Sequence, residues 1–215
     1  MSSAAPNRAP LSPAEFAAAL GGVSRETLAR LEAYAALLRQ WSTRINLVAK
    51  ATLEDVWRRH FLDSAQLRPL VPQGAKSLVD LGSGAGFPGL ALAILGVPGV
   101  ELIEADARKA AFLREAARVT GTELRITNER IESLPPRVVD VVTARGCAPL
   151  DRLLPLAERF IGPSTLCLFP KGERARHEVA AAQRDWTMQI VRRASLSDER
   201  GVILCLTRVA RRERG

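Results

Sequence analysis

Four glycines fall within residues 82–89, in the stretch DLGSGAGFPGLALAI that runs from Asp80 to Ile94. Each glycine costs extra backbone entropy on folding, so this density indicates a backbone that a bound molecule approaches closely. The spacing Gly84-x-Gly86-x-x-Gly89 matches the dinucleotide-binding fingerprint and suggests an NAD-type oxidoreductase as the first interpretation. A lone match of this kind is a weak signal, so the neighbouring residues have to decide.

The residues around these glycines argue against a phosphate-binding loop. Counted from the preceding strand, the pattern is Asp80-x-Gly82-x-Gly84-x-Gly86, which puts a carboxylate where it would repel phosphate. Pro88 is tolerated only in the first turn of a helix, so the next helix does not begin inside the fingerprint with its N-terminus facing a pyrophosphate. We therefore expect a wide bend that accepts a bulky uncharged group, with Asp80 next to an ammonium group.

A second carboxylate, Glu104, ends the next apolar stretch in LIEAD. In a doubly wound sheet this position accepts hydrogen bonds from a ribose diol. A ligand that combines a ribose and an amino-acid ammonium group, without phosphate, is S-adenosylmethionine. Glu104 alone could equally be an ordinary charge at a strand end, but together with Asp80 and the glycines it predicts S-adenosylmethionine as the cofactor.

The rest of the chain predicts the scaffold for these residues. Apolar residues at helical spacing and N-capping signals predict helices over 11–22, 24–41 and 52–67. From Ser77 onward short apolar runs alternate with helical segments, which predicts an α/β fold with a doubly wound, mostly parallel sheet. The last two strands have no room for a crossover helix between them and predict an antiparallel C-terminal hairpin. The seven expected strands are 77–82, 100–105, 123–127, 138–144, 164–170, 187–195 and 201–209.

This pattern divides the chain into four parts. We expect a flexible N-terminus over 1–10, a helical cap over 11–76, the cofactor-binding core over 77–209 and a basic tail over 210–215.

Charge is distributed unevenly along the chain. The net charge is +4 over residues 1–76, −1 over 77–170 and +5 over 171–215. A nearly neutral centre with basic flanks is expected of a catalytic core with surfaces for a polyanion. Of the 31 basic residues 27 are arginine, which suits phosphate contacts and stacking on bases, although genome composition would also explain this bias.

Several classes of function receive no support. The three cysteines are widely spaced without a C-x-x-C pair, and His60 and His177 lie outside any metal-binding pattern, so we expect no metal. There is no membrane-length apolar stretch and no secretory pattern at the start. We therefore expect a cytoplasmic protein without a membrane partner, and no obligate protein partner is evident.

Four motifs, WRRHFLDS, DLGSGAGFPG, NERIE and LFPKG in this order, resemble the small-subunit rRNA 7-methylguanosine methyltransferases, also called glucose-inhibited division protein B. The resemblance runs from about Trp41 to Gly172 and implies a Rossmann-like class I methyltransferase fold. It also implies 16S ribosomal RNA as the partner, within the small ribosomal subunit. One departure is Ala144-Arg145-Gly146, where the family usually has Ser-Arg-Ala, so a hydroxyl before the arginine is absent.

The resemblance implies roles for individual residues. S-adenosylmethionine would lie over the glycine loop, in contact with Gly82 and Phe87, with Arg145, and near its adenine with Ile131 and Glu132. Arg145, Lys171 and Arg130 are the candidate catalytic residues, which grip phosphate or the guanine edge and orient the cofactor. Arg58, Arg59, His60 and the basic C-terminal part would widen the RNA footprint, while a solvated tail is the simpler role for Arg211, Arg212 and Arg214.

Guanine N7 carries an in-plane lone pair, so its methylation needs no base, and in-line transfer depends mainly on orientation. This fits the lack of a Cys or His at an expected base or nucleophile position, and it disfavours Cys147 as a nucleophile. Two other classes stay open: a methyltransferase of the same fold with a different acceptor, and a non-catalytic RNA-binding module.

Overall fold

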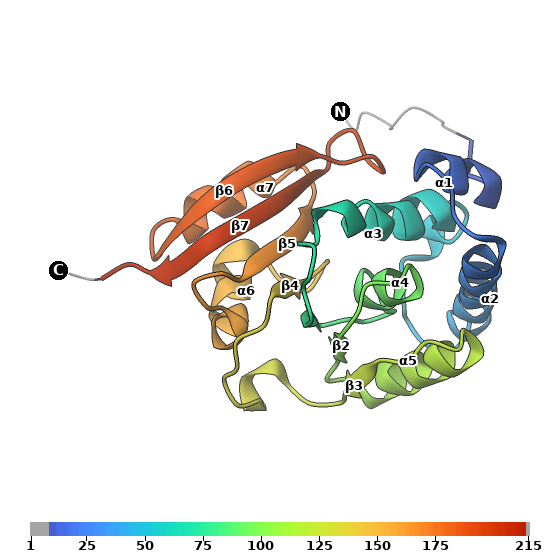
Figure 1. Ribbon diagram of the computed structural model, residues 1–215, viewed down its shortest axis with the longest axis horizontal. Helices are drawn as coiled ribbons and strands as arrows, with labels where there is room; N and C mark the ends of the chain where they lie inside the picture. The colour runs from blue at the N-terminus through green and yellow to red at the C-terminus, as the bar shows by residue number, and fades with distance from the viewer. Residues whose placement is uncertain (1–8, 214–215) are drawn as a thin grey trace.

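A single seven-stranded sheet forms the centre of the protein in the computed structural model, which describes residues 9–213 (Figure 1). The strand order is β3-β2-β1-β4-β5-β7-β6, and all pairs are parallel except those that involve β7. The predicted seven strands and C-terminal hairpin are thereby confirmed. The strands are β1 (Leu78–Leu81), β2 (Val100–Ile103), β3 (Arg125–Thr127), β4 (Val141–Thr143), β5 (Leu166–Lys171), β6 (Trp186–Ala194) and β7 (Val202–Arg211).

The order of the strands creates a switch point between β1 and β4. From β1 the chain moves outward to β2 and β3, then returns to the other side of β1 as β4 and continues to β5. Connections at such a point leave in opposite directions, so a crevice opens beyond the carboxyl ends of β1 and β4. The glycine loop follows β1 and Arg145 follows β4, so both lie at this crevice.

Helices cover the two faces of the sheet. One hydrophobic cluster joins α4 (Gly89–Ile94) and α5 (Ala107–Val119) to the cap helix α2 (Arg25–Trp41). A second cluster, on the other face, contains α6 (Leu150–Ala157), α7 (Ala175–Ala182) and the buried side of β7. Strands β1, β4 and β5 contribute to both clusters, as expected for strands buried on both faces.

The cap begins with the helices that its capping signals predict. Ser12 accepts a hydrogen bond from the backbone of Glu15, whose side chain bonds back to Ser12, and α1 spans Pro13–Ala19. Helix α2 follows with Ser24 as its N-cap. At 17 residues α2 is the longest helix described, and no helix within 9–213 is long and apolar enough to cross a membrane.

The prediction of one regular helix over 52–67 is wrong. A 3₁₀ turn covers Lys50–Thr52, the segment Trp57–Leu62 is π-helical, and α3 (Asp63–Ala65) is followed by a 3₁₀ turn at Arg68–Leu70. π-Helical segments often occur at functional sites because the extra residue per turn redirects side chains. Here the π-helical segment contains His60 and leads directly to Asp63.

The ends of the chain differ from the expected boundaries. Most of the N-terminus expected to be flexible, residues 1–8, lies outside the described residues, as does Arg214 of the expected tail. Strand β7 continues to Arg211, whose guanidinium pairs with Glu158 at 2.8 Å and lies over the ring of Trp186. Arg211 therefore belongs to the sheet and does not form a solvated tail.

The cap and the sheet share one aromatic centre. Tyr34 of α2 is fully buried, stacks on Phe87 at 5.1 Å between ring centroids, and meets Phe61 edge-on at 5.4 Å. Its hydroxyl donates a hydrogen bond to the carbonyl of Ala85 in the glycine loop. The cap therefore packs directly on the loop that is predicted to bind the cofactor.

Replacement of Tyr34 by Phe should reveal this coupling. The variant keeps the ring but leaves the Ala85 carbonyl without its donor, so we expect the free energy of unfolding to fall by about 1–3 kcal/mol. Urea unfolding would be followed by far-UV circular dichroism and by the fluorescence of the three tryptophans, of which Trp41 and Trp57 lie in the cap and Trp186 in β6. Coincident transitions are expected in both proteins, and a cap that unfolds separately from the sheet would contradict the shared core.

Candidate functional site

The glycine loop after β1 approaches the cap closely on one side and is open on the other. Gly82, Gly84 and Gly86 have φ angles of +62°, +57° and +89°, which favour glycine. A Cβ on Gly82 would lie 2.7 Å from the sulfur of Cys147, and one on Gly86 would lie 2.5 Å from the hydroxyl of Tyr34. At Gly84 the nearest atom would be 3.8 Å away, so this residue presents bare backbone to open space.

A cavity of about 300 Å³ lies over this loop. The loop forms one wall, a segment of the cap forms the opposite wall, and Arg145 lies between them. This first cavity is lined by Leu47, Val48, Ala49, Thr52, His60, Gly82, Ser83, Gly84, Ala85, Phe87, Lys109, Arg145 and Gly146. The sequence predicted the loop and Arg145 at this place, but not the wall from the cap.

Glu104 lies at the edge of the loop, as predicted. One carboxylate oxygen accepts the backbone N–H of Gly84 at 2.8 Å, and the other accepts that of Asp106 at 2.8 Å. Each oxygen of a carboxylate has a second lone pair, so Glu104 keeps acceptor capacity. It is 7 % exposed and does not line the first cavity, so its contact with a ribose diol stays a prediction. Its bond to Gly84 fixes the orientation of both groups.

Asp80 does not lie where a contact with the ammonium group of the cofactor would need it. Its side chain is 0 % exposed, and its oxygens accept hydrogen bonds from the Thr143 hydroxyl at 2.8 Å and the Gly89 N–H at 3.2 Å. It does not line the first cavity. Burial raises the pKa of Asp80 to about 6, against the opposing effect of these hydrogen bonds. In this structure Asp80 anchors the start of α4, and its contact with an ammonium group stays a prediction.

The segment expected near the adenine lies beyond β3. Ile131 is buried and begins a 3₁₀ turn (Ile131–Ser133), while Arg130 and Glu132 are exposed. Arg159 donates hydrogen bonds to the carbonyls of Glu132 and Leu134 and so fixes this turn. The structure does not bring Arg130 into contact with Arg145 or Lys171, so its role also stays a prediction.

Phe87 forms the base of the site. Its ring is 3 % exposed, stacks on the imidazole of His60 at 5.0 Å between centroids, and has the Arg145 guanidinium 5.1 Å from its centre. The peptide bond between Phe87 and Pro88 is cis. The predicted cofactor contacts Gly82, Phe87 and Arg145 thus line a single cavity, together with His60.

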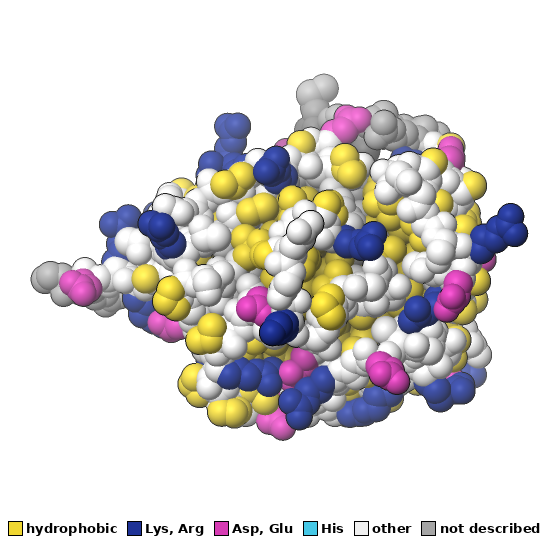
Figure 2. Space-filling model, viewed as in Figure 1, with side chains coloured by type: hydrophobic (Ala, Val, Ile, Leu, Met, Phe, Trp, Pro, Cys, Tyr) yellow, Lys and Arg dark blue, Asp and Glu magenta, His cyan; other side chains and the backbone are white. Residues whose placement is uncertain are grey.

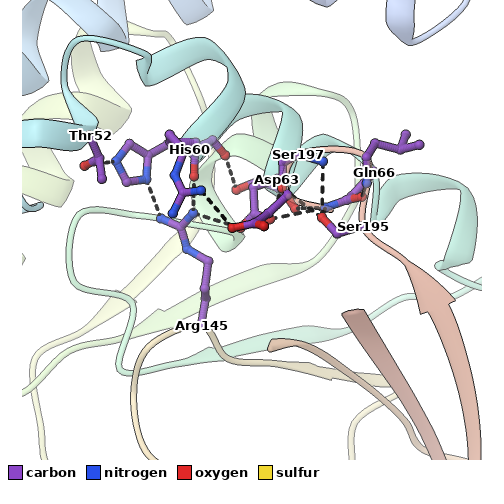
Figure 3. A network of polar contacts seen from close by, with 11 residues as sticks. Thr52, His60, Asp63, Gln66, Arg145, Ser195 and Ser197 are labelled. Carbon is purple, nitrogen blue, oxygen red and sulfur yellow. Dashed lines mark hydrogen bonds and ion pairs between the residues drawn. The ribbon is translucent and has the colours of Figure 1, made fainter. Parts of the chain in front are cut away.

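Arg145 is the centre of a polar network that reaches the cap and the hairpin (Figure 3). Its guanidinium donates to the carbonyl of Arg59 at 2.9 Å, to the Asp63 carboxylate at 3.0 Å and to Nδ1 of His60 at 2.8 Å. Asp63 in turn accepts the hydroxyl of Ser197, which lies in the turn between β6 and β7. Segments far apart in the sequence therefore fix the direction of Arg145.

Lys171 is held inside the protein instead of reaching out from it. Its ammonium donates to the carbonyl of Ala148 at 2.8 Å and pairs with Glu178 at 2.8 Å, and the side chain is only 9 % exposed. Glu178 also accepts the N–H of Leu150. Lys171 therefore fastens the loop that follows Arg145 to α7, and any contact with substrate stays a prediction.

A second cavity, of about 320 Å³, lies on the other side of Arg145. Thr52, His60, Arg145 and Gly146 line both cavities, so these residues form the boundary between them. The second cavity is bordered by the turn after β6 and by the ends of β4 and β5. Its other lining residues are Arg59, Asp63, Pro170, Lys171, Gly172, Ser195, Ser197, Asp198, Gly201 and Val202.

Cys147 is not activated as a nucleophile. Burial raises the pKa of the Cys147 thiol, and the charges of Asp80 and Glu104 raise it further, so the thiolate is disfavoured. Residues 9–213 contain no group of three or more His, Cys, Asp or Glu side chains that could hold a metal ion.

The residues present fit S-adenosylmethionine. Open backbone at Gly84 offers a place where a side chain would fill the cavity, and the carboxylate of Glu104 is bonded to this backbone. The apolar wall from Leu47 and Val48 suits the uncharged parts of such a ligand, and Phe87 also lines the cavity. The buried carboxylate of Asp80 contributes negative charge behind the loop.

Comparison with known sequences identifies the family. The pattern that defines the family described as "GidB: rRNA small subunit methyltransferase G" matches residues 27–202. The chain belongs to this family. "Ribosomal RNA small subunit methyltransferase G" of Rhodospirillum centenum is 57 % identical over 198 residues, which cover 92 % of this chain and 91 % of that protein. The protein of the same name from Rhodospirillum rubrum is 55 % identical over 201 residues, which cover 94 % and 100 %.

Solved structures confirm the methyltransferase fold for this member of the GidB family. A TehB-like S-adenosylmethionine-dependent methyltransferase from Corynebacterium glutamicum has a TM-score of 0.54 at 16 % identity and covers 83 % of this chain and 98 % of that one. A variant of the protein MtNAS in complex with S-adenosylmethionine has a TM-score of 0.56 at 12 % identity, with 91 % and 77 % covered.

Sequence reasoning missed His60 and Asp63 as parts of the site of this GidB family member. His60 was assigned to an RNA-binding surface with Arg58 and Arg59, but its side chain is buried. The side chain of Arg58 is 13 % exposed and is bound to Asp55, so of these three Arg59 is the most exposed. No local pattern signals that His60 belongs to the site, because His60 lies in a π-helical segment and its partner Arg145 is 85 residues away.

Replacement of Asp80 by Asn should change how stability depends on pH. Because folding raises the pKa of Asp80, its contribution to stability is complete below pH 3.8 and is lost as the pH rises through about 6. Asn does not titrate, so the stability of the variant relative to wild type should increase by about 1 kcal/mol between about pH 5 and about pH 8. Urea unfolding at several pH values measures this difference. Asp151→Asn, an exposed change on α6, serves as control, and a similar pH response in both variants would contradict the assignment.

Proposed function

We propose that this protein transfers the methyl group of S-adenosylmethionine to N7 of a guanine in 16S ribosomal RNA, within the small ribosomal subunit in the cytoplasm. The observation that carries the proposal is the pair of cavities that share Arg145 as their boundary, in a chain of the rRNA small subunit methyltransferase G family. One cavity is suited to the cofactor, and the other leads from it to the surface.

The first cavity would hold the cofactor through Gly82, Gly84, Phe87 and Glu104, with Ile131 and Glu132 near the adenine. S-Adenosylmethionine supplies an activated methyl group on a sulfonium. The protein itself contributes orientation: Phe87 and Arg145 form a rigid boundary at which donor and acceptor can meet. Well-oriented reactants gain a large effective concentration, and this effect is sufficient when the acceptor nitrogen already carries a free lone pair.

The charges of the site agree with an acceptor that needs no base. Burial and the nearby charges of Arg145 and Arg59 lower the pKa of His60 to about 3, and its Nδ1 is occupied by Arg145. Cys147 has a raised pKa. Neither group is suited to remove a proton or to attack carbon at neutral pH, whereas methylation at N7 requires neither step.

The second cavity has the polarity expected of a site for an uncharged nucleobase. Its three cations are all paired: Arg59 with Asp198, Arg145 with Asp63, and Lys171 with Glu178. A phosphate would have to compete with these carboxylates. A guanine ring carries both donors and acceptors and could bind among paired charges without separating them. We therefore propose that the guanine that accepts the methyl group binds in this cavity and that the RNA phosphates lie outside it.

Basic residues outside the cavities would bind the RNA backbone. Lys and Arg side chains surround the β6–β7 hairpin and the lower edge of the face shown in Figure 2. Arg192 and Arg193 are exposed on β6, and Arg130 is exposed beyond β3. Contacts of this kind make affinity fall steeply with salt, so the hairpin should contribute most of the salt dependence.

The direct test uses labelled S-adenosylmethionine and 30S subunits from a strain that lacks this activity, followed by mapping of the modified base. We expect label on one guanine at N7, in assembled subunits. Label on protein or on a pyrimidine would refute the proposal, and binding of NADH in place of S-adenosylmethionine would restore the oxidoreductase interpretation.

Replacement of Arg145 by Ala should lower kcat by about 100-fold, because the boundary between the two cavities would lose its fixed guanidinium. The matched control is Arg118→Ala, which removes the same charge from the exposed end of α5, where Arg118 pairs with Glu115. The control should methylate 30S subunits at the rate of wild type. An Arg145→Ala enzyme with unchanged kcat would exclude Arg145 from the reaction.

A further inference from the structure

The hydrogen atoms between Thr52 and Arg145 can be assigned from the contacts of His60. The Thr52 hydroxyl donates its single hydrogen to the carbonyl of Ala49 at 2.6 Å. The same oxygen lies 2.8 Å from Nε2 of His60, so here it has to accept, and Nε2 has to carry a hydrogen. At the other side of the ring, the Arg145 guanidinium has only donors, so Nδ1 at 2.8 Å has to accept.

The contact with Arg145 therefore fixes the state of the ring, and the contacts of Thr52 are compatible with it. His60 is a neutral imidazole with its hydrogen on Nε2, and it links Arg145 to Thr52 (Figure 3). The hydrogen bonds then run in one direction from Arg145 through His60 and Thr52 to Ala49. Protonation of Nδ1 would replace an acceptor by a donor that faces Arg145. The ring is 6 % exposed, and burial with the charges of Arg145 and Arg59 lowers its pKa to about 3.

This arrangement determines which donors Arg145 can offer. Of its five N–H groups, three are bound by the Arg59 carbonyl, the Asp63 carboxylate and Nδ1 of His60. The hydrogen bonds within the described residues leave Nε–H and one hydrogen of Nη2. The side chain is 19 % exposed and lines both cavities, so these two donors are at the boundary where cofactor and acceptor would meet.

We propose that His60 is a positioning residue: its neutral imidazole, locked as the Nε2–H form by Thr52, holds the Arg145 guanidinium so that its two remaining N–H groups point to the reacting groups. The proposal rests on the proposed methyl transfer. His60 itself neither takes up nor releases a proton in the reaction. Asp63 holds the same guanidinium at a different nitrogen, so the two residues together set its plane.

Two substitutions test separately whether Arg145 needs the hydrogen-bond acceptor of His60 or its aromatic ring. Phe keeps an aromatic ring to stack on Phe87 but offers Arg145 no acceptor. Asn loses the stacking but keeps a carbonyl oxygen at the place of Nδ1. We expect His60→Phe to lower kcat on 30S subunits by about 100-fold and His60→Asn to stay within about 10-fold of wild type. His60 also lines the cofactor cavity, so the Kd of S-adenosylmethionine, measured by calorimetry, should rise, but in His60→Phe by less than kcat falls.

Thr52→Val provides a graded variant that leaves His60 in place. Without the hydroxyl, Nε2–H loses its acceptor and the tautomer that opposes Arg145 becomes accessible, so kcat should fall by about 5- to 10-fold. Unchanged kcat in His60→Phe, or equal losses in His60→Phe and His60→Asn with equally lowered melting temperatures, would overturn the positioning role. The positioning role would also be overturned if the pH profile of kcat had a limb near neutral pH that is absent in His60→Asn, because such a limb identifies His60 as a general base.

A spectroscopic test is independent of activity. The chain has only two histidines, so ¹⁵N-histidine NMR of wild type and His60→Asn assigns the ring of His60 directly. We expect the Nε2–H tautomer, with no titration between about pH 5 and about pH 8. An Nδ1–H tautomer, or titration in this range, would refute the proposal. If this spectrum is as expected but wild type fails to methylate 30S subunits, it is the proposed function that fails.

Discussion

The contact on which the site depends is the stacking of Phe87 between Tyr34 and His60. Through this one ring, the glycine loop, helix α2 and the π-helical segment are packed against each other, and the Arg145 guanidinium lies over its face. Stacked aromatic rings with buried edges have few alternative arrangements, because close packing leaves no room for reorientation. A loop rich in glycine, which would otherwise be flexible, acquires a fixed shape from the cap that covers it.

The second constraint is that nearly all charges around Arg145 are already paired within the protein. Charged side chains at the mouth of a cavity cost less to bury when each has a partner, and their directions are then fixed before any substrate arrives. Such preorganisation suits a reaction in which no proton has to be moved by the enzyme. In this respect the site differs from those that rely on a residue with a pKa near neutrality.

The sequence predicted the sheet well because apolar runs, glycines and caps are local signals. Asp80, Gly82, Gly84 and Glu104 follow from position in a doubly wound fold, and the structure places them around one loop, although Asp80 faces away from the cavity. The role of His60 was not accessible in this way. It depends on a π-helical turn and on contacts with residues more than 80 positions away, which periodicity cannot report. Likewise, the family resemblance suggested that Lys171 acts in the active site or on RNA, whereas its partner on α7 becomes visible only in three dimensions.

The shared core also has a consequence for the order in which the chain is made. The cap helices precede the glycine loop in the sequence, so Tyr34 and Phe61 leave the ribosome before the ring of Phe87 that packs between them and His60. Until Phe87, α4 and α5 have also emerged, α2 can pack only on the rest of the cap, and the apolar surface that these elements cover is exposed to solvent and chaperones. The N-terminal third of this protein is therefore synthesised first but completes its core only with the middle third.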